Sequence, residues 1–116
     1  MSMTNDEYIK LYNTARACSI DAIDASSDDL YAESDIMPHD VYIDIPLYTS
    51  FAKCAAHFGH AQAIYSHNIA RIFVTHYQSS IMNIVFAKCF ASHLNKHNII
   101  TQIVVYNGHK ATKIRG

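Results

Sequence analysis

The sequence predicts an α/β fold, in which an N-terminal helix is followed by a small β-α-β-α-β unit with a three-stranded, mostly parallel sheet. Apolar residues recur at helical spacing in three segments, and apolar runs of strand length lie between and after them. Gly and Pro are scarce, at three and two of 116 residues, which argues against a fold of many hairpins. Helical crossovers usually join parallel strands. The length suits a single domain over residues 1–116.

The first element is a helix within residues 1–23. Thr4 and Glu7 stand three residues apart and fit a capping box, and an apolar stripe of imperfect helical spacing follows them. Residues 24–40 are rich in Asp and Ser, which favours an acidic linker between this helix and an α/β core at residues 41–108.

The core begins with a strand at residues 41–48, where apolar and polar residues alternate as far as Pro46. A helix follows from Ser50, because Phe51 and later apolar residues recur at helical spacing. Gly59 lies inside this helix, so a break there is the alternative to one continuous helix.

The second half of the core repeats this order. The apolar centre of residues 69–77 predicts a strand, and Ser79 or Ser80 is a cap for a helix that ends near Lys96. The near-continuous apolar run at 99–106 predicts a strand covered on both faces. Residues 109–116 then form a basic tail, which we expect to be mobile.

Two short motifs occur twice in the same order. The tetrapeptide at Phe51–Cys54 recurs at Phe86–Cys89, and the tripeptide at His67–Ile69 recurs at His97–Ile99. The sequence leaves open whether this is a duplicated helix–strand unit or a coincidence in a biased composition.

The charges are divided along the chain. All ten carboxylates lie in residues 1–44 with two basic residues, which gives that segment a formal charge of 2 − 10 = −8. Residues 45–116 carry seven Lys or Arg, no acid and seven of the eight His. A surface without carboxylates attracts anionic partners.

The leading hypothesis is therefore a small non-enzymatic protein whose basic and His-rich face binds an anionic partner, most plausibly nucleic acid. Lys53, His57 and His60 fall on one stripe of the predicted second helix, and tyrosines interleaved with the other cations offer rings for base stacking. The predicted strand ends at 48–50, 75–80 and 106–110 carry further polar groups, at the edge where open parallel sheets bind ligands. The candidate phosphate or nucleic-acid ligands are Lys53, His57, His60, Arg71, Ser80, Lys110, Lys113 and Arg115.

A second hypothesis is an inhibitor or regulator of another protein, of the kind that viruses or mobile elements encode as accessory proteins. Its acidic first third would imitate phosphates and occupy the nucleic-acid site of a partner. The residues that would bind this partner are Asp24, Asp28, Asp29, Glu33 and Asp35.

Two further alternatives remain. One is an enzyme acting on a small phosphorylated substrate, with His76 or His109 as general base, although the chain has no GxGxxG, P-loop, HExxH or GxSxG motif. The other is a homodimer in which the two oppositely charged segments meet between chains. We assign no catalytic residue for the leading hypothesis.

Metal, cofactor and membrane binding are not expected. The Cys and His residues near Cys54 and Cys89 lack the paired spacing of zinc sites. Three cysteines without CxxC spacing argue against a disulfide framework and favour a reducing compartment. The polar, acidic N-terminus has no signal-peptide core, and no apolar run reaches the roughly 20 residues of a membrane span. We therefore expect a cytoplasmic protein, in the host cytoplasm if it is viral.

Overall fold

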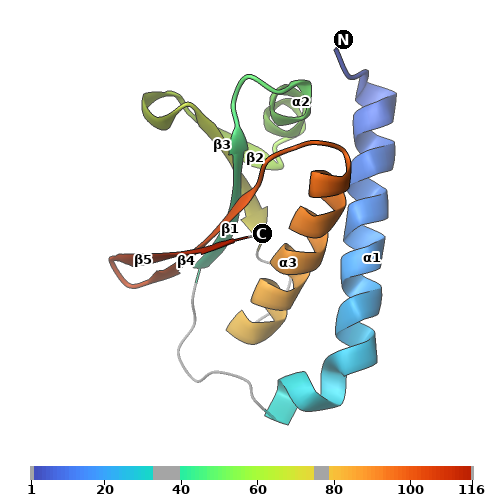
Figure 1. Ribbon diagram of the computed structural model, residues 1–116, viewed down its shortest axis with the longest axis vertical. Coiled ribbons are helices and arrows are strands. Elements are labelled where there is room, and N and C mark those ends of the chain that lie inside the picture. Colours follow the sequence, from blue (N-terminus) through green and yellow to red (C-terminus); the bar gives the residue numbers. More distant parts are fainter. Residues whose placement is uncertain (1, 33–39, 75–78, 116) are drawn as a thin grey trace.

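The computed structural model describes residues 2–32, 40–74 and 79–115. Helices lie on one side of a curved sheet, and α1 forms an outer layer that packs mainly on α3 (Figure 1). In chain order the elements are α1 (Asn5–Ala32), β1 (Asp40–Pro46), α2 (Ser50–His57), β2 (Ala61–Ile64), a 3-10 turn (Tyr65–His67), β3 (Ile69–Val74), α3 (Ser80–Lys96), β4 (Gln102–Asn107) and β5 (Lys110–Arg115).

The sheet has five strands in the order β2-β3-β1-β4-β5, and every neighbouring pair is antiparallel. The prediction of a three-stranded, mostly parallel sheet is therefore wrong. The segment from β1 to β4 has the β-α-β-β-α-β arrangement known as ferredoxin-like, to which α1 and β5 are added.

The error has a topological cause. The strands that each helix connects do run in the same direction, β1 with β2 and β3 with β4, but another strand lies between them in each case. Strand β2 went unpredicted because the helix was expected to continue through it. Without β2, the reversal that brings β3 antiparallel to β1 cannot be seen in the sequence.

Helix α1 begins as predicted and ends later. The backbone N–H of Glu7 donates to Thr4 Oγ1 at 3.1 Å, and the backbone N–H of Thr4 donates to Glu7 Oε1 at 3.1 Å, so the capping box is present. The hydrogen bonds to Thr4 lower the pKa of the Glu7 carboxyl. The helix continues to Ala32, so the first part of the predicted acidic linker is helical, while residues 33–39 lie outside the described part of the chain.

Helix α2 ends at His57, so the prediction of a helix that continues past Gly59 is wrong, and the alternative of a break at Gly59 describes the structure. Gly59 has a φ of +75°, a left-handed conformation that glycine adopts without a steric penalty. Because the helix stops here, His60 lies in the loop, and Ile64 and His67 belong to β2 and the 3-10 turn. The predicted stripe of cations along one long helix does not form.

Helix α3 has the predicted bounds, Ser80–Lys96, with Ser79 as its N-cap.

The repeated tripeptide also has a local structural meaning. Asn68 and Asn98 have φ values of +58° and +62°, and each stands between a helical turn and a strand. Asn tolerates this left-handed conformation better than most residues, which makes it suitable for ending a helix.

The predicted mobile tail is strand β5. Residues 108 and 109 form a two-residue turn between β4 and β5, and Gly108, the first of them, has a φ of +64°. Glycine at the first central position is typical of a tight hairpin turn. The basic residues of this segment therefore have a fixed register against β4 instead of forming a free arm.

The core fills the space between the sheet and the three helices. Tyr8 of α1 is fully buried and stacks on Phe58 with ring centroids 5.4 Å apart. Its hydroxyl lies 2.6 Å from Nδ1 of His60, whose ring also stacks on Tyr12 at 4.2 Å. This aromatic cluster joins α1 to the loop between α2 and β2.

The cluster predicts a pH dependence of stability. Burial, and then the charge of Arg16, lower the pKa of His60 from its ordinary value of 6.5, and burial also lowers that of His93. As pH falls below the unfolded value of 6.5, the unfolded chain therefore binds protons before the folded one, and stability decreases.

We expect urea denaturation to show a lower free energy of unfolding at about pH 5.5 than at about pH 7.5, a range in which His is the main titrating side chain. Gln at position 60 keeps an acceptor for Tyr8 and cannot titrate, so His60→Gln should reduce this difference. The exposed His109 provides the control, because His109→Gln should leave it unchanged. An undiminished pH dependence in His60→Gln would contradict the assignment.

Candidate functional site

One face of the sheet has no helix over it among the described residues (Figure 1). Residues alternate between faces along each strand, so Val41, Ile43 and Ile45 of β1 enter the core while Tyr42 and Asp44 lie on the other face. We call this second surface the open face. Its positions on the three central strands are Asp40, Tyr42, Asp44 and Pro46 of β1, Ile69, Arg71 and Phe73 of β3, and Gln102, Val104 and Tyr106 of β4.

Arg71 is at the centre of the open face and is held in one orientation. Its Nε donates to Asp44 Oδ1 at 2.8 Å and its Nη2 donates to Asp44 Oδ2 at 2.9 Å, a two-point ion pair across the β1–β3 register. Its Nη1 donates to the Tyr106 hydroxyl at 2.8 Å. Three of the five guanidinium donors are thus used, which leaves two for a ligand.

Aromatic rings surround this guanidinium. Its carbon lies 5.3 Å from the ring centroid of Tyr42 and 5.4 Å from that of Tyr106, within cation–π range. The Tyr42 ring meets those of Phe73 and Tyr106 edge to face, with centroids 6.3 and 5.8 Å apart. Phe73 is 39% exposed, so a large apolar ring faces solvent at the middle of the sheet.

Two hollows flank the contact between Arg71 and Tyr106, and both residues line each of them. The larger has a volume of ≈ 380 Å³ and the smaller one of ≈ 280 Å³. The larger is also lined by Asp44, Ile64, His67, Ile69, Gln102 and Lys113. The smaller is also lined by Asp40, Tyr42, Gln62, Phe73 and Gly108.

Two groups on the open face have shifted pKa values. The hydrogen bonds that Arg71 donates to Asp44 raise the pKa of Arg71 above its usual value, so the guanidinium stays charged. Burial, and then the charge of Asp40, raise the pKa of the Tyr42 hydroxyl, so this phenol stays neutral. The face therefore offers the neutral phenol of Tyr42, the fixed cation of Arg71, the exposed Lys113 and the exposed carboxylate of Asp40.

The structure separates the predicted phosphate-binding residues. Lys53 and His57 are exposed on α2, on the helix side of the sheet, and His60 is engaged with Tyr8. Ser80 is buried at the start of α3 and has partners of its own. Of that predicted set, only Arg71 and Lys113 are described as lining the open face, and Lys110 and Arg115 lie on the same strand as Lys113.

The prediction that strand ends converge at one edge is also wrong. Because β1 runs opposite to β3 and β4, residues 48–50 lie at the other end of the sheet from residues 106–110. Residues 75–78 lie outside the described residues. They include His76, so the structure does not test the predicted role of His76 as a general base. His109 is exposed in the turn before β5.

Three of the five residues proposed to bind an acidic-site partner lie on α1, and two lie outside the described residues. Asp24 is exposed on α1, Asp28 and Asp29 lie on the same helix near its end, and Glu33 and Asp35 are not described. The last turn of α1 has no basic residue, although cations are the residues that stabilise a helix C-terminus.

The division of charge along the chain does not persist in space. Strand β1, which carries Asp40 and Asp44, lies between β3 and β4 from the basic part of the chain. The central cation Arg71 is therefore neutralised by Asp44, as the ion pair shows. The expectation of one carboxylate-free surface is wrong for the open face, where Asp40 is also exposed, and the exposed cation described there is Lys113 of β5.

Sequence reasoning missed Tyr42, Asp44 and Phe73 as members of a site. A signal for them exists, because Arg71 and Phe73 are two residues apart in one strand and Tyr42 and Asp44 are two apart in another, so each pair shares a face. The sequence does not show that these strands are neighbours, or that the face they share is uncovered.

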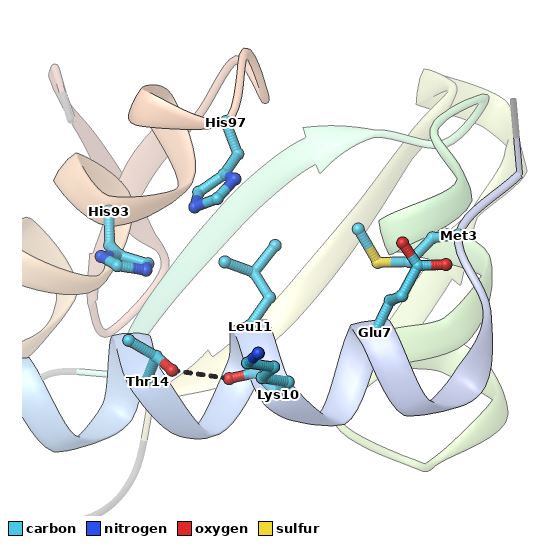
Figure 2. Close-up of a pocket in the computed structure, with 7 residues that line it drawn as sticks. All are labelled: Met3, Glu7, Lys10, Leu11, Thr14, His93 and His97. Atoms are coloured by element: carbon cyan, nitrogen blue, oxygen red, sulfur yellow. Dashed lines mark hydrogen bonds between the residues drawn. The ribbon is translucent and has the colours of Figure 1, made fainter.

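A second groove, of ≈ 470 Å³, lies between α1 and α3. Figure 2 shows His93 and His97 of α3 projecting toward Leu11 and Thr14 of α1. Glu7 and Lys10 bring opposite charges to the same groove, and Glu7 already accepts the cap hydrogen bond from Thr4. Among the described residues, this groove is lined by two imidazoles but by no Tyr or Phe ring and no guanidinium, whereas the open face has both, so the open face is the better candidate for a stacking site.

Within the described part of the chain, no three His, Cys, Asp or Glu side chains are grouped so that they could hold a metal ion. No described helix combines the length and the apolar character that crossing a membrane requires.

Comparison with protein-family models, with curated proteins and with solved structures found no match. The function must therefore be inferred from the open face itself.

Proposed function

We propose that this protein binds single-stranded nucleic acid on the open face of its sheet. The observation that carries the proposal is the grouping of Tyr42, Phe73 and Tyr106 around the fixed guanidinium of Arg71. Aromatic side chains on an uncovered sheet are a known platform for unpaired bases, because every base has a π-face.

The charges of the neighbouring strand support this occupant. Strand β5 carries no acid, and its exposed Lys113 lines the open face; position 115 alternates onto the same face, whereas position 110 alternates onto the other. Strand β5 lies at one edge of the sheet, beside the strand that carries Tyr106. A backbone following β5 would have cations beside it while its bases reached the aromatic rings of the central strands.

The composition of the open face distinguishes this proposal from a homodimer. The centre of a stable dimer interface is depleted in charged residues. Here the centre is an ion pair, and the exposed amides of Gln62 and Gln102 lie on the same face. A polar surface with isolated aromatic rings suits a hydrated nucleic-acid interface better.

The proposal predicts a selective effect of ring removal. Each of Phe73→Ala and Tyr42→Ala should weaken binding to a single strand by about 1–3 kcal/mol, the usual contribution of stacking one base. The measurement is fluorescence anisotropy at low salt with labelled RNA and DNA of about 12 nucleotides, within the ~4–16 nucleotides that single-strand binding folds cover.

Phe58 gives a matched control for this experiment. It has the same residue type and the same 39% exposure as Phe73, but it lies on the helix side of the sheet and stacks on Tyr8. Phe58→Ala should leave affinity unchanged. The proposal fails if the protein binds no single strand at low salt, or if Phe58→Ala weakens binding as much as Phe73→Ala does.

A further inference from the structure

The two hollows of the open face differ in chemistry although they share Arg71 and Tyr106. In the smaller hollow, the rings of Tyr42 and Phe73 stand beside the amide of Gln62 and the carboxylate of Asp40. A carboxylate repels phosphate but accepts hydrogen bonds from the N–H groups of a base. The rings supply stacking, and the amide both donates and accepts.

The larger hollow has the opposite character. Lys113 and His67 are both exposed, and the amide of Gln102 is beside them. Asp44 also lines this hollow, but each of its oxygens already accepts a hydrogen bond from Arg71. The ammonium group of Lys113 is thus the cation free to meet an anion there.

We infer that the open face binds a nucleotide in two parts, with the base in the hollow of Tyr42 and Phe73 and the phosphate in the hollow of Lys113. Arg71 and Tyr106 separate the two parts and contact both. The inference rests on the proposed function and adds to it a division of the open face: the base lies at the end of the strands that carries Asp40 and Phe73, and the phosphate lies at the end that carries Ile69 and Gln102.

The test compares two probes with two protein variants. The probes are a labelled single strand of about 12 nucleotides and a strand of equal length with abasic sites throughout, which keeps the phosphates and removes the bases. Phe73→Ala should weaken binding of the normal strand by about 5- to 150-fold and leave binding of the abasic strand unchanged. Lys113→Ala should weaken binding of the normal strand and of the abasic strand to the same extent.

Salt dependence gives an independent measurement. Each phosphate contact contributes about −0.7 to the slope of log K against log salt concentration for a single strand. Lys113→Ala should therefore make the slope shallower by about 0.7, and Phe73→Ala should leave it unchanged. Lys53→Ala, which removes an exposed lysine on the helix side, is the matched control and should change neither affinity nor slope.

The possible failures can be told apart. If the protein binds the normal strand but both variants have the same effect on both probes and on the slope, the two-part division is wrong and the proposed function stands. If the protein does not bind the normal strand at low salt, both are wrong.

Discussion

Replacing Phe90 by Ala is expected to lower the free energy of unfolding by about 3–5 kcal/mol, the usual cost of removing a buried phenylalanine ring. Phe90 is 1% exposed on α3. Its ring contacts Phe86 on the same helix and meets Tyr12 of α1 edge to face, with centroids 6.0 and 5.4 Å apart. Phe90 therefore packs α3 against α1.

The expected loss is a large part of the roughly 5–15 kcal/mol that stabilises an ordinary domain. Urea denaturation followed by circular dichroism measures it, and Phe90→Leu keeps most of the volume if the alanine variant does not fold. Phe73→Ala is the comparison, because the same atoms are removed from a ring that is 39% exposed, and it should cost much less. Equal costs at the two positions would contradict the packing of α1 on α3.

A small cost for Phe73→Ala would also show that the effect of this substitution on nucleic-acid binding is not caused by unfolding.

The sequence predicted local structure better than topology. The capping box at Thr4 and the bounds of α3 depend on interactions within a few residues, and both predictions are confirmed. The direction of the strands depends on β2, whose four residues, Ala61–Ile64, have no pronounced strand character and directly follow a helical pattern. Strand β5 was missed for a related reason, because its charged residues resemble a solvated tail unless β4 is known to lie beside it.

The candidate site was predicted only in part. Arg71 and Lys113 were chosen for their charge and lie on the open face, whereas Lys53 and His60 were chosen with them and do not. A residue's charge can be read from sequence, but the face it occupies depends on which strands are neighbours and where helices pack. Phe73 shows the same limit: the sequence places it in the apolar centre of a predicted strand, and only the structure shows that it is an exposed ring on an uncovered face.

The ion pair between Asp44 and Arg71 gives the second large effect on stability. Asp44 is 9% exposed and Arg71 19% exposed, so removal of one partner leaves a mostly desolvated charge. Such a loss costs about 3–5 kcal/mol in a fully buried pair, and partial exposure of Arg71 reduces the expected cost of Asp44→Ala to about 1–3 kcal/mol. The double variant Asp44→Ala/Arg71→Ala should lose less than the sum of the two single variants, because it leaves no unpaired charge.

The same substitution is expected to change nucleic-acid binding in the opposite direction. In Asp44→Ala the guanidinium of Arg71 loses the carboxylate that neutralises it and becomes available to a phosphate of the bound strand. Affinity at low salt should therefore rise, and the slope of log K against log salt concentration should steepen by about 0.7. Anisotropy titrations at several salt concentrations measure both quantities, and the double variant, which has no guanidinium to release, should show neither change. If Asp44→Ala acted only by destabilising the fold, it would weaken binding. Tighter binding by a less stable protein would therefore show that Asp44 restrains Arg71 in the native protein. Weaker binding with an unchanged slope would contradict this role of Asp44.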